Sequence, residues 1–220
     1  MKSRNGFLIT VEGCEGCGKS TQSKLLERYL QKKGLKVVLT REPGGSVVAE
    51  QVRNILLNPK SKLSPICELM LYESARAQHV EEIIKPNLQK GYVVICDRFT
   101  DSTIAYQGYA RKIDIKIIEK LNDIATSLIK PDLTIYLDIK PHIGIKKAKS
   151  ISTKDSFKDG DRIERENMTF HNAVRKGFIA LAKKFPERIK KVKTNSVIEK
   201  TQFLVNTEID KFFTKKKIYV

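Results

Sequence analysis

A complete G-x-x-x-x-G-K-[ST] pattern near the start of the chain narrows the possible folds sharply. It reads Gly13-Cys14-Glu15-Gly16-Cys17-Gly18-Lys19-Ser20. An apolar run over residues 7–12 precedes it and a segment with helical spacing over residues 19–33 follows it. Glycines let the backbone turn so that its N–H groups face a polyphosphate, and the following helix adds its positive end. The pattern therefore predicts a strand, a phosphate-binding loop and a helix in succession, with Lys19 neutralising phosphate charge and Ser20 binding Mg²⁺.

The rest of the chain repeats this alternation of short apolar runs and longer helical segments. The predicted strands cover residues 7–12, 36–40, 92–96, 133–138 and 189–192. The predicted helices cover residues 19–33, 65–85, 114–127, 141–149, 164–185 and 197–213, with a kink or restart at Pro86. Such alternation is typical of a parallel sheet covered by helices on both faces. We therefore predict one α/β domain over residues 1–220, a three-layer α/β/α fold of the P-loop NTPase type with a five-stranded parallel sheet.

The charge balance is the unusual feature of the composition. The chain has 42 Lys and Arg against 25 Asp and Glu, a net charge of +17, and residues 183–217 alone carry 11 basic residues against 4 acidic ones. Such an excess attracts nucleic acid, anionic lipid or nucleotides. Because the basic run lacks a recognition motif, we interpret it as a solvated lysine-rich surface. A P-loop protein that binds nucleic acid stays open as an alternative, and it predicts strongly salt-dependent binding.

The apolar runs and the cysteines indicate which cellular compartment suits the protein. No run approaches the roughly 18 apolar residues of a membrane span, and the first residues lack a signal-peptide core. The four cysteines are too sparse for a disulfide scaffold and suit a reducing compartment. Cys14 and Cys17 form a C-x-x-C pair, but no second Cys or His pair with zinc-ligand spacing accompanies them. We expect a cytoplasmic protein without a membrane partner.

Charged residues follow two further predicted strands. Asp97 and Arg98 come directly after residues 92–96, and Arg41 follows residues 36–40. Ligands of open α/β folds bind at this carboxyl edge of the sheet. Asp97 is placed to act on hydrated Mg²⁺ and Arg98 to hold a second phosphate bidentately, with a buried structural ion pair as the alternative. Two arginines near one phosphate loop imply an anionic acceptor. A GTPase is disfavoured, because residues 129–132 carry Ile where a guanine reader needs Asn or Thr.

Taken together, four motifs make the chain similar to bacterial-type thymidylate kinases over essentially its whole length. They are the phosphate loop, Thr40-Arg41-Glu42-Pro43-Gly44-Gly45, Leu71-Tyr72-Glu73-Ser74-Ala75-Arg76-Ala77-Gln78-His79, and Asp97-Arg98-Phe99-Thr100-Asp101-Ser102-Thr103-Ile104-Ala105-Tyr106-Gln107-Gly108. The resemblance implies transfer of the γ-phosphoryl group of ATP to dTMP, giving dTDP and ADP for dTTP synthesis. It also implies dependence on Mg²⁺ and a homodimer. Another nucleoside or nucleotide kinase is the nearest rival.

The resemblance implies a role for each matching residue. Tyr72 falls where the family stacks a ring on thymine, and Tyr106 falls where it favours deoxyribose, with ordinary core packing as the alternative for both. Glu15 falls where an acidic residue contacts the 3′-hydroxyl of the acceptor. The other predicted substrate-binding residues are Arg41, Glu42, Arg53, Arg76, Arg98, Thr103 and Gln107. The predicted ATP-binding residues are Gly13, Cys14, Glu15, Gly16, Cys17, Gly18, Lys19, Ser20 and Thr21. The three histidines, His79, His142 and His171, have no partner pattern and are read as non-catalytic.

Residues 150–160 are polar and aperiodic, which predicts a mobile loop. The resemblance makes residues 150–162 a short helical lid over ATP, with a basic residue near the transferred group because Glu15 is acidic. Arg162 is the first candidate for that residue, followed by Lys149, Lys154 and Lys158. The lid is rich in lysine where arginines are common in the family, and lysine cannot bridge two oxygens as a guanidinium does. The predicted catalytic residues are Lys19, Arg98, Glu15 and Arg162.

Overall fold

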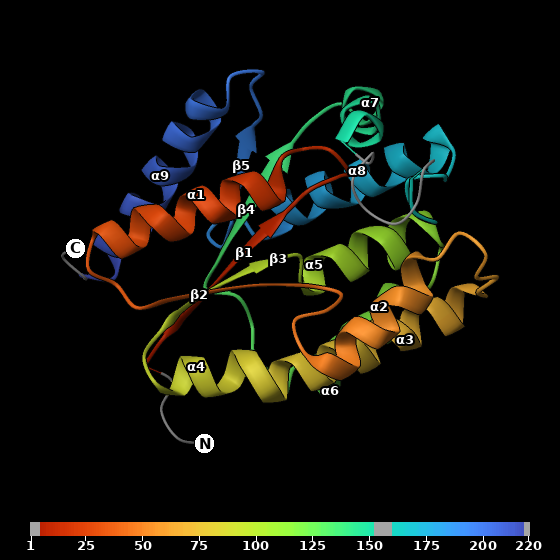
Figure 1. Cartoon of the computed structure of the whole chain (residues 1–220), viewed down its shortest axis with the longest axis horizontal. Helices are drawn as coiled ribbons and strands as arrows, with labels where there is room; N and C mark the ends of the chain where they lie inside the picture. The colour runs from red at the N-terminus through yellow and green to blue at the C-terminus, as the bar shows by residue number, and fades with distance from the viewer. Residues whose placement is uncertain (1–4, 152–159, 218–220) are drawn as a thin grey trace.

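The structure is a computed structural model, and it describes residues 5–151 and 160–217. All five strands of its sheet run parallel, in the order β2-β3-β1-β4-β5 (Figure 1). The strands are β1 Phe7–Glu12, β2 Val37–Arg41, β3 Val93–Asp97, β4 Leu133–Asp138 and β5 Ile189–Lys193. The predicted five-stranded parallel sheet is therefore confirmed, and each strand begins and ends within one residue of its predicted position.

Helices connect the strands. They are α1 Lys19–Lys32, α2 Val47–Leu57, α3 Pro65–His79, α4 Lys85–Gln89, α5 Thr100–Thr103, α6 Ile115–Ala125, α7 Pro141–Ile151, α8 Met168–Lys184 and α9 Ile198–Lys215, with π-helical segments η1 Val80–Ile84 and η2 Ile104–Ala110. Helix α8 begins four residues later than predicted, because Asn167 caps it by accepting a hydrogen bond from Phe170 N at 2.9 Å. Residues 152–159 of the predicted lid lie outside the described residues.

Two helical segments were not predicted. Helix α2 buries only Ala49 and Leu56. Its apolar residues nevertheless recur at helical spacing, at positions 48, 49, 52, 55 and 56, a pattern that the prediction did not use. Residues 100–110 form α5 and η2, although β-branched residues and a glycine make this sequence a weak helix former. Both segments are reached by short loops from strand ends, residues 42–46 after β2 and residues 98–99 after β3, and both supply residues to the cleft described below.

The predicted restart of the helix at Pro86 is confirmed, because α4 begins at Lys85 with Pro86 in its first turn. The π-helical segment η1, which joins α3 to α4, was not predicted. A π-helical segment of this kind is rare and often marks a functional region.

The core lies on both faces of the sheet because successive residues of each strand point to opposite sides. Ile9 faces the side covered by α1 and α9, where it packs with Leu30 and Ile209. Leu8 faces the opposite side, where Ile84 belongs to its cluster from η1 (Figure 1). Full burial of such a side chain stabilises a fold by roughly 1.5–3 kcal/mol. The three-layer arrangement predicted from the sequence follows from this double burial.

Strand register brings distant charged residues together at one edge. Arg41 pairs with Asp97 across β2 and β3, and Val11 pairs with Asp97 across β1 and β3. The phosphate loop leaves β1 at this edge, between β3 and β4, where the order of the strands changes direction. Such a switch point is where open α/β sheets bind ligands. Among the described residues, no helix combines the length and apolar character required to cross a bilayer.

Candidate active site

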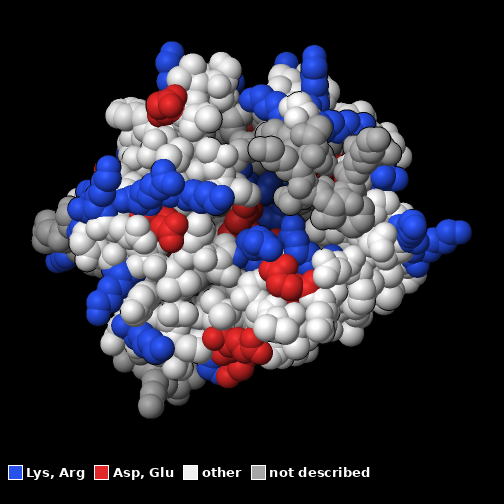
Figure 2. Space-filling view, viewed as in Figure 1, with Lys and Arg blue, Asp and Glu red and all other residues white. Residues whose placement is uncertain are grey.

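A cleft of about 250 Å³ opens at this edge of the sheet. In Figure 2, basic and acidic side chains meet near the middle of the visible face. Most of the residues predicted from the sequence line the cleft, namely Glu15, Gly16, Lys19, Ser20, Arg41, Glu42, Arg53, Tyr72, Arg76, Asp97, Arg98, Thr103, Tyr106 and Gln107. The predicted residues outside its lining are Gly13, Cys14, Cys17, Gly18, Thr21 and Arg162.

The phosphate loop depends on glycine at two positions. Gly16 has φ 64°, and a Cβ there would lie 1.9 Å from the carbonyl oxygen of Gly144 in α7. Gly18 has φ 93° and caps α1. A larger residue would strain or displace the loop at either position. No described side chain caps the first turn of α1, which leaves its N–H groups for an anionic ligand.

Lys19 and Ser20 begin α1 beside the cleft. Lys19 Nζ donates to the main-chain oxygens of Gly13 at 3.1 Å and Cys14 at 3.0 Å. Ser20 Oγ donates to Asp97 Oδ2 at 2.7 Å, so a hydroxyl and a carboxylate from different elements converge. Oxygen donors of these two kinds are what Mg²⁺ prefers, so the pair fits that ion.

Arg98 is held in a strained conformation at the end of β3. Its φ of 72° is uncommon for a residue with a side chain and costs about 1–2 kcal/mol. Its Nη1 donates to Gly13 O at 3.1 Å and Ser102 Oγ at 3.2 Å, and its Nη2 donates to Glu15 Oε1 at 2.9 Å. The guanidinium also lies 5.0 Å from the centre of the Tyr106 ring. These contacts fix one cation against the phosphate loop.

Glu15 is the acidic side chain of the loop, and it is buried. Its Oε1 accepts hydrogen bonds from Arg98 and from the Tyr106 hydroxyl. Burial alone would raise the pKa of Glu15, but the neighbouring His171 and the charges of Arg98 and Lys19 outweigh it and lower the pKa below its ordinary value. The carboxylate therefore stays charged inside the cleft.

Two more arginines face the same space. Arg41 pairs with Glu50 at 3.0 Å and remains exposed, while Arg53 Nη1 donates to Pro43 O at 2.7 Å. Burial and the nearby charge of Arg41 lower the pKa of Arg53. Together with Arg98, they place three cations around one cleft, which favours an anionic ligand.

The opposite wall is a buried network centred on Arg76. Its side chain donates to Glu42 at 2.8 Å, Glu73 at 2.7 Å, Thr103 at 2.8 Å and Asn122 at 2.8 Å. Burial alone would lower the pKa of Arg76, but the two carboxylates raise it above its ordinary value. Residues from four separate segments thus hold one guanidinium at the cleft. Glu42, predicted as a substrate-binding residue, serves here as a partner of Arg76.

Glu68 organises the far end of this wall. It is 1% exposed and accepts from Gln107 at 2.8 Å and from Arg111 at 3.0 Å. Burial alone would raise the pKa of Glu68, but these hydrogen bonds and the charges of Arg111 and Arg162 lower it. Gln107 is therefore fixed through its amide nitrogen. Tyr72 lines the cleft from α3, one turn beyond Glu68.

The structure does not bring Arg162 to the phosphate loop. Its Nη1 donates to Glu68 Oε2 at 2.6 Å and its Nε to Leu56 O at 2.8 Å. Arg162 was predicted because of its charge and its place at the end of the lid, and nothing in the sequence indicated that Glu68 of α3 would be a competing partner. Its role at the transferred group stays a prediction.

Several residues that shape the cleft were not identified from the sequence. Ser102, Asp161 and Glu164 line it. Ser102 and Asp161 adjoin the predicted residues Thr103 and Arg162, and Glu164 lies two residues beyond Arg162. Burial raises the pKa of both Asp161 and Glu164. Asn122, which holds Arg76, carried no signal because it lies within the periodic pattern of α6. The buried His171 of α8 was read as non-catalytic.

Buried thiols and histidines offer no evident metal chemistry. Burial raises the pKa of the Cys14 and Cys17 thiols, which disfavours reactive thiolates. Among the described residues, Glu42, His79 and Cys96 place their ligand atoms within 4.8 Å of one another. His79 is engaged with Glu42, and the guanidinium bound to Glu42 opposes a cation. We interpret this group as hydrogen-bonded packing.

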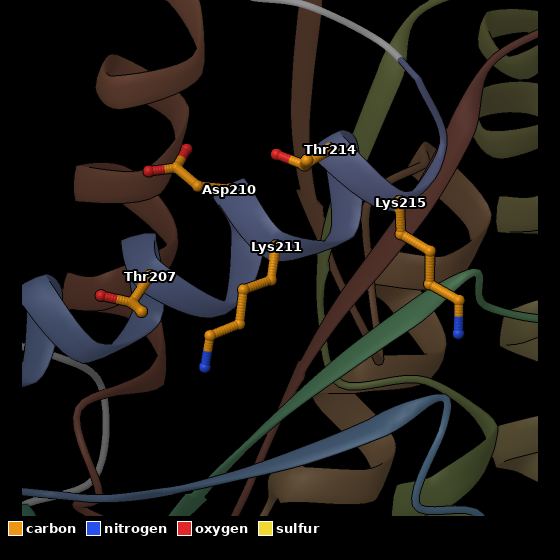
Figure 3. Close-up of a pocket in the computed structure, with 5 residues that line it drawn as sticks. All are labelled: Thr207, Asp210, Lys211, Thr214 and Lys215. Atoms are coloured by element: carbon orange, nitrogen blue, oxygen red, sulfur yellow. The ribbon is translucent and has the colours of Figure 1, made fainter.

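A second surface hollow lies along α9. Its lining consists of Thr207, Asp210, Lys211, Thr214 and Lys215 (Figure 3). All of these come from one helix, so no groups converge from separate elements. Asp210 already accepts from the Tyr29 hydroxyl, and Lys215 already pairs with Glu187. We assign no ligand to this hollow.

Comparison with known families gives one clear match. The family model described as thymidylate kinase matches residues 11–205 of this chain.

Individual relatives agree with that match over most of their length. A thymidylate kinase of Geobacter sp. (strain M21) is 48% identical over 201 residues, which cover 91% of this chain and 89% of that protein. One from Gloeobacter violaceus is 42% identical over 211 residues, which cover 96% and 98% of the two chains. The crystal structure of thymidylate kinase from Ehrlichia chaffeensis matches with a TM-score of 0.76 and 36% identity, covering 93% of this chain and 99% of that one.

Proposed function

The chain belongs to the thymidylate kinase family, and on that premise we propose that it transfers the γ-phosphoryl group of ATP to dTMP, giving dTDP and ADP. One observation carries the proposal beyond the family. The phosphate loop with Lys19 faces a second set of phosphate-binding groups around Arg98 within the same cleft. Two anionic nucleotides that meet head to head require such an arrangement.

Alignment and charge account for the proposed rate enhancement. Phosphoryl transfer gives a protein little covalent work, so the residues hold two substrates in line and neutralise shared negative charge. Main-chain N–H groups of the loop and Lys19 would bind the ATP phosphates. Arg98, with Arg41 and Arg53 nearby, would hold the phosphate of dTMP. Glu15 would orient the acceptor through its 3′-hydroxyl.

Ser20 and Asp97 would hold the magnesium ion that we propose as a cofactor. When bound, Mg²⁺ would neutralise charge on the ATP phosphates. The 2.7 Å hydrogen bond between the two side chains keeps both oxygen donors at the phosphate-loop end of the cleft. We expect chelation by EDTA to abolish turnover and added Mg²⁺ to restore it.

The base would be recognised by the network on the opposite wall. Tyr72 would stack on thymine, while Arg76, Thr103 and Gln107 would read its polar edge. Tyr106 would crowd the 2′ position and favour deoxyribose. A methyl group in an apolar pocket is worth only about 1–3 kcal/mol, so dUMP should react more slowly rather than be excluded.

A coupled ADP-release assay tests the function directly. The acceptors are dTMP, dUMP, dCMP, dGMP, UMP and thymidine, each with ATP and Mg²⁺. We expect dTMP to be used most efficiently, dUMP more slowly, and thymidine not at all because it lacks the phosphate that Arg98 binds. Preference for another acceptor would assign the chain to a different nucleotide kinase activity.

Arg162 would have to leave Glu68 to act at the transferred group. The 2.6 Å contact between them makes that exchange the step to test. We expect Arg162→Ala to lower kcat much more than it alters the affinity for dTMP. Glu68→Gln, which keeps a neutral acceptor, is the matched variant, and it should leave kcat closer to that of the unmodified protein. Unchanged turnover in Arg162→Ala would remove this residue from the mechanism.

Exposed apolar residues on neighbouring helices support a homodimer. Helices α2, α3 and α6 lie side by side. Their exposed apolar side chains are Val47, Val48, Ile55, Ile66, Met70, Ile117 and Ile124. Exposed apolar side chains gathered on neighbouring helices are typical of an interface. We expect Ile66→Glu to shift the mass measured by light scattering toward a monomer, while Phe203→Glu, at a site on α9 that is 71% exposed against 55% for Ile66, should leave the mass unchanged.

The proposal also covers the domain organisation of the chain, its cellular compartment and its partners. We propose one nucleoside monophosphate kinase-like domain over residues 1–220, acting in the cytoplasm without a nucleic-acid partner. Lys and Arg are spread widely over the face seen in Figure 2 rather than confined to one stripe. Filter binding to RNA at physiological salt tests this, and nanomolar affinity without dTMP-dependent ADP release would favour the nucleic-acid alternative.

A further inference from the structure

A buried histidine that the proposed reaction does not use faces the carboxylate of Glu15. His171 lies in α8, is 1% exposed, and places its Nδ1 3.4 Å from Glu15 Oε2. In the part of the chain that the structure describes, neither ring nitrogen of His171 has a hydrogen-bond partner, and neither does Glu15 Oε2. The two unpartnered groups therefore lie against each other inside the protein.

The burial of these groups makes the contact between them important for stability. A buried polar atom without a hydrogen-bond partner is unfavourable, and leaving a charged carboxylate oxygen unpaired costs more free energy than leaving a neutral oxygen unpaired. Glu15 Oε1 already accepts from Arg98 and Tyr106, and His171 Nδ1 lies beside the other oxygen, Oε2, so a hydrogen bond from His171 would hold the carboxylate at both oxygens. A small rotation of the imidazole or the carboxylate would turn the 3.4 Å contact into a hydrogen bond.

Helix α8 is well placed to hold the histidine still. Phe170, the residue before it, packs edge-on against the Tyr106 ring at 6.1 Å and against the His171 ring at 5.6 Å. Tyr106 in turn bonds to Glu15. The same helix therefore supports the Glu15 carboxylate from two directions, through a tyrosine on one oxygen and a histidine beside the other.

We propose that His171 is a positioning residue, which donates from Nδ1 to Glu15 Oε2 and thereby fixes the carboxylate against Arg98. A neutral imidazole with its proton on Nδ1 is sufficient, since it leaves no buried charge without a partner. The inference rests on the proposed function, because the orientation of Glu15 matters for turnover only if the cleft phosphorylates dTMP. A carboxylate free to rotate would weaken its contact with the acceptor and disturb the guanidinium of Arg98.

Two substitutions of similar size separate positioning from packing. In His171→Asn, the amide nitrogen stands near the former Nδ1 and can still donate, whereas His171→Leu has a similar shape without a donor. Both remove the ring beside Phe170 to the same extent. We expect His171→Leu to lower kcat about tenfold with little change in the KM for ATP, the size of effect given by a lost hydrogen bond to a charged group. His171→Asn should retain kcat within about threefold. Equal losses in the two variants would overturn the proposal.

A double-mutant cycle with Glu15→Gln tests whether the histidine acts through Glu15. If it does, adding His171→Leu to Glu15→Gln should change kcat by less than about twofold, because the carboxylate it positions is already gone. A further tenfold loss in the double variant would show an independent role and overturn the proposal.

The unmodified protein, His171→Leu, Glu15→Gln and the double variant also give a measurement that does not depend on activity. If the contact exists, their urea unfolding should be non-additive, with the double variant losing less stability than the two single variants together. Absence of this coupling would overturn the inference even in an active kinase. Failure of the unmodified protein to phosphorylate dTMP would instead refute the proposed function and leave the unfolding cycle to decide on the contact.

Discussion

The two walls of the cleft are built in different ways. The phosphate wall comes from one continuous stretch, residues 13–20, whose main chain and Lys19 provide the binding groups. The base wall is assembled from the loop that follows β2 and from α3, α5 and α6, and its central group, Arg76, is held by buried side chains from each of them.

This difference separates function from stability. Binding groups that belong to the main chain depend little on distant side chains, so a substitution on the phosphate wall should remove activity and spare the fold. The base wall consists of buried charges that satisfy one another, and breaking such a set is destabilising because charge is left without a partner. Substitutions there should therefore affect recognition and stability together.

Lys19→Met should have the largest effect on activity. This substitution removes the only side-chain cation of residues 13–20. It should lower kcat/KM by about 1000-fold, because the Lys19 ammonium would neutralise the negative charge shared by the phosphates of ATP and dTMP in the transition state. Stability should change by no more than about 1 kcal/mol, since Lys19 donates to two main-chain oxygens and, at 3.7 Å, to Cys17 Sγ, and has no carboxylate among these partners. ADP release and urea unfolding measure the two quantities. Lys24→Met, at an exposed position of the same helix, should alter neither.

Arg76→Met should affect both quantities. It leaves Glu42 and Glu73 buried without their counter-charge, which should cost about 3–5 kcal/mol of unfolding free energy. The KM for dTMP should rise at least tenfold while the KM for ATP changes little. Urea unfolding and steady-state kinetics measure these effects.

An exposed ion pair provides the control for that stability loss. Arg41→Met removes the partner of Glu50 at the surface, where such a pair is worth about 0–1 kcal/mol. A comparable loss of stability in the two variants would contradict the distinction between the walls.

The phosphate wall could be predicted from spacing in the sequence, whereas the base wall could not, and the difference has a physical reason. The phosphate wall is local, so spacing alone revealed its loop, strand and helix. The base wall required the resemblance to a family, because nothing in the periodic pattern of α6 indicates that Asn122 reaches Arg76. Arg162 illustrates the same limit, since its partner Glu68 lies almost a hundred residues away in sequence.

The central strands β1, β3 and β4 are buried on both faces, which produces short, distinct apolar runs. Strand β5 buries only Ile189 and Val192 among its lysines, so its run is the weaker signal. Helix α2 was not predicted although its apolar residues have helical spacing, so its signal was present in the sequence. Residues 100–110 were not predicted because their helical form depends on tertiary contacts rather than propensity. The sequence thus predicted the sheet well and the surroundings of the base poorly.

Glu12 lies where the two walls meet, and it makes their junction sensitive to pH. Its carboxylate accepts from Phe99 N at 2.8 Å and from Ser102 Oγ at 2.6 Å, which anchors the start of α5. Burial, and then the negative charge of Asp101, raise the pKa of Glu12 from 4.5 to about 8. Between these values the folded protein binds a proton that the unfolded chain has lost, so stability falls as pH rises and levels off above about 8.

Glu12→Gln should remove this dependence. The amide keeps an oxygen for Phe99 N and cannot ionise, so the unmodified protein should lose about 2 kcal/mol relative to the variant between pH 6 and pH 8. Urea unfolding at intervals across that range measures the difference. Parallel pH profiles for the two proteins would contradict the raised pKa.

Tyr72→Phe should have the smallest effect, and it sharpens what the base wall contributes. Tyr72 lines the cleft, and stacking on thymine requires the ring rather than the hydroxyl. The KM for dTMP should therefore change by less than about twofold, whereas Tyr72→Ala, the control that removes the ring, should raise it at least tenfold. Steady-state kinetics with varied dTMP measures both. A large effect of Tyr72→Phe would show that the hydroxyl binds substrate, and the base wall would then recognise thymine by one more polar contact than the network around Arg76 provides.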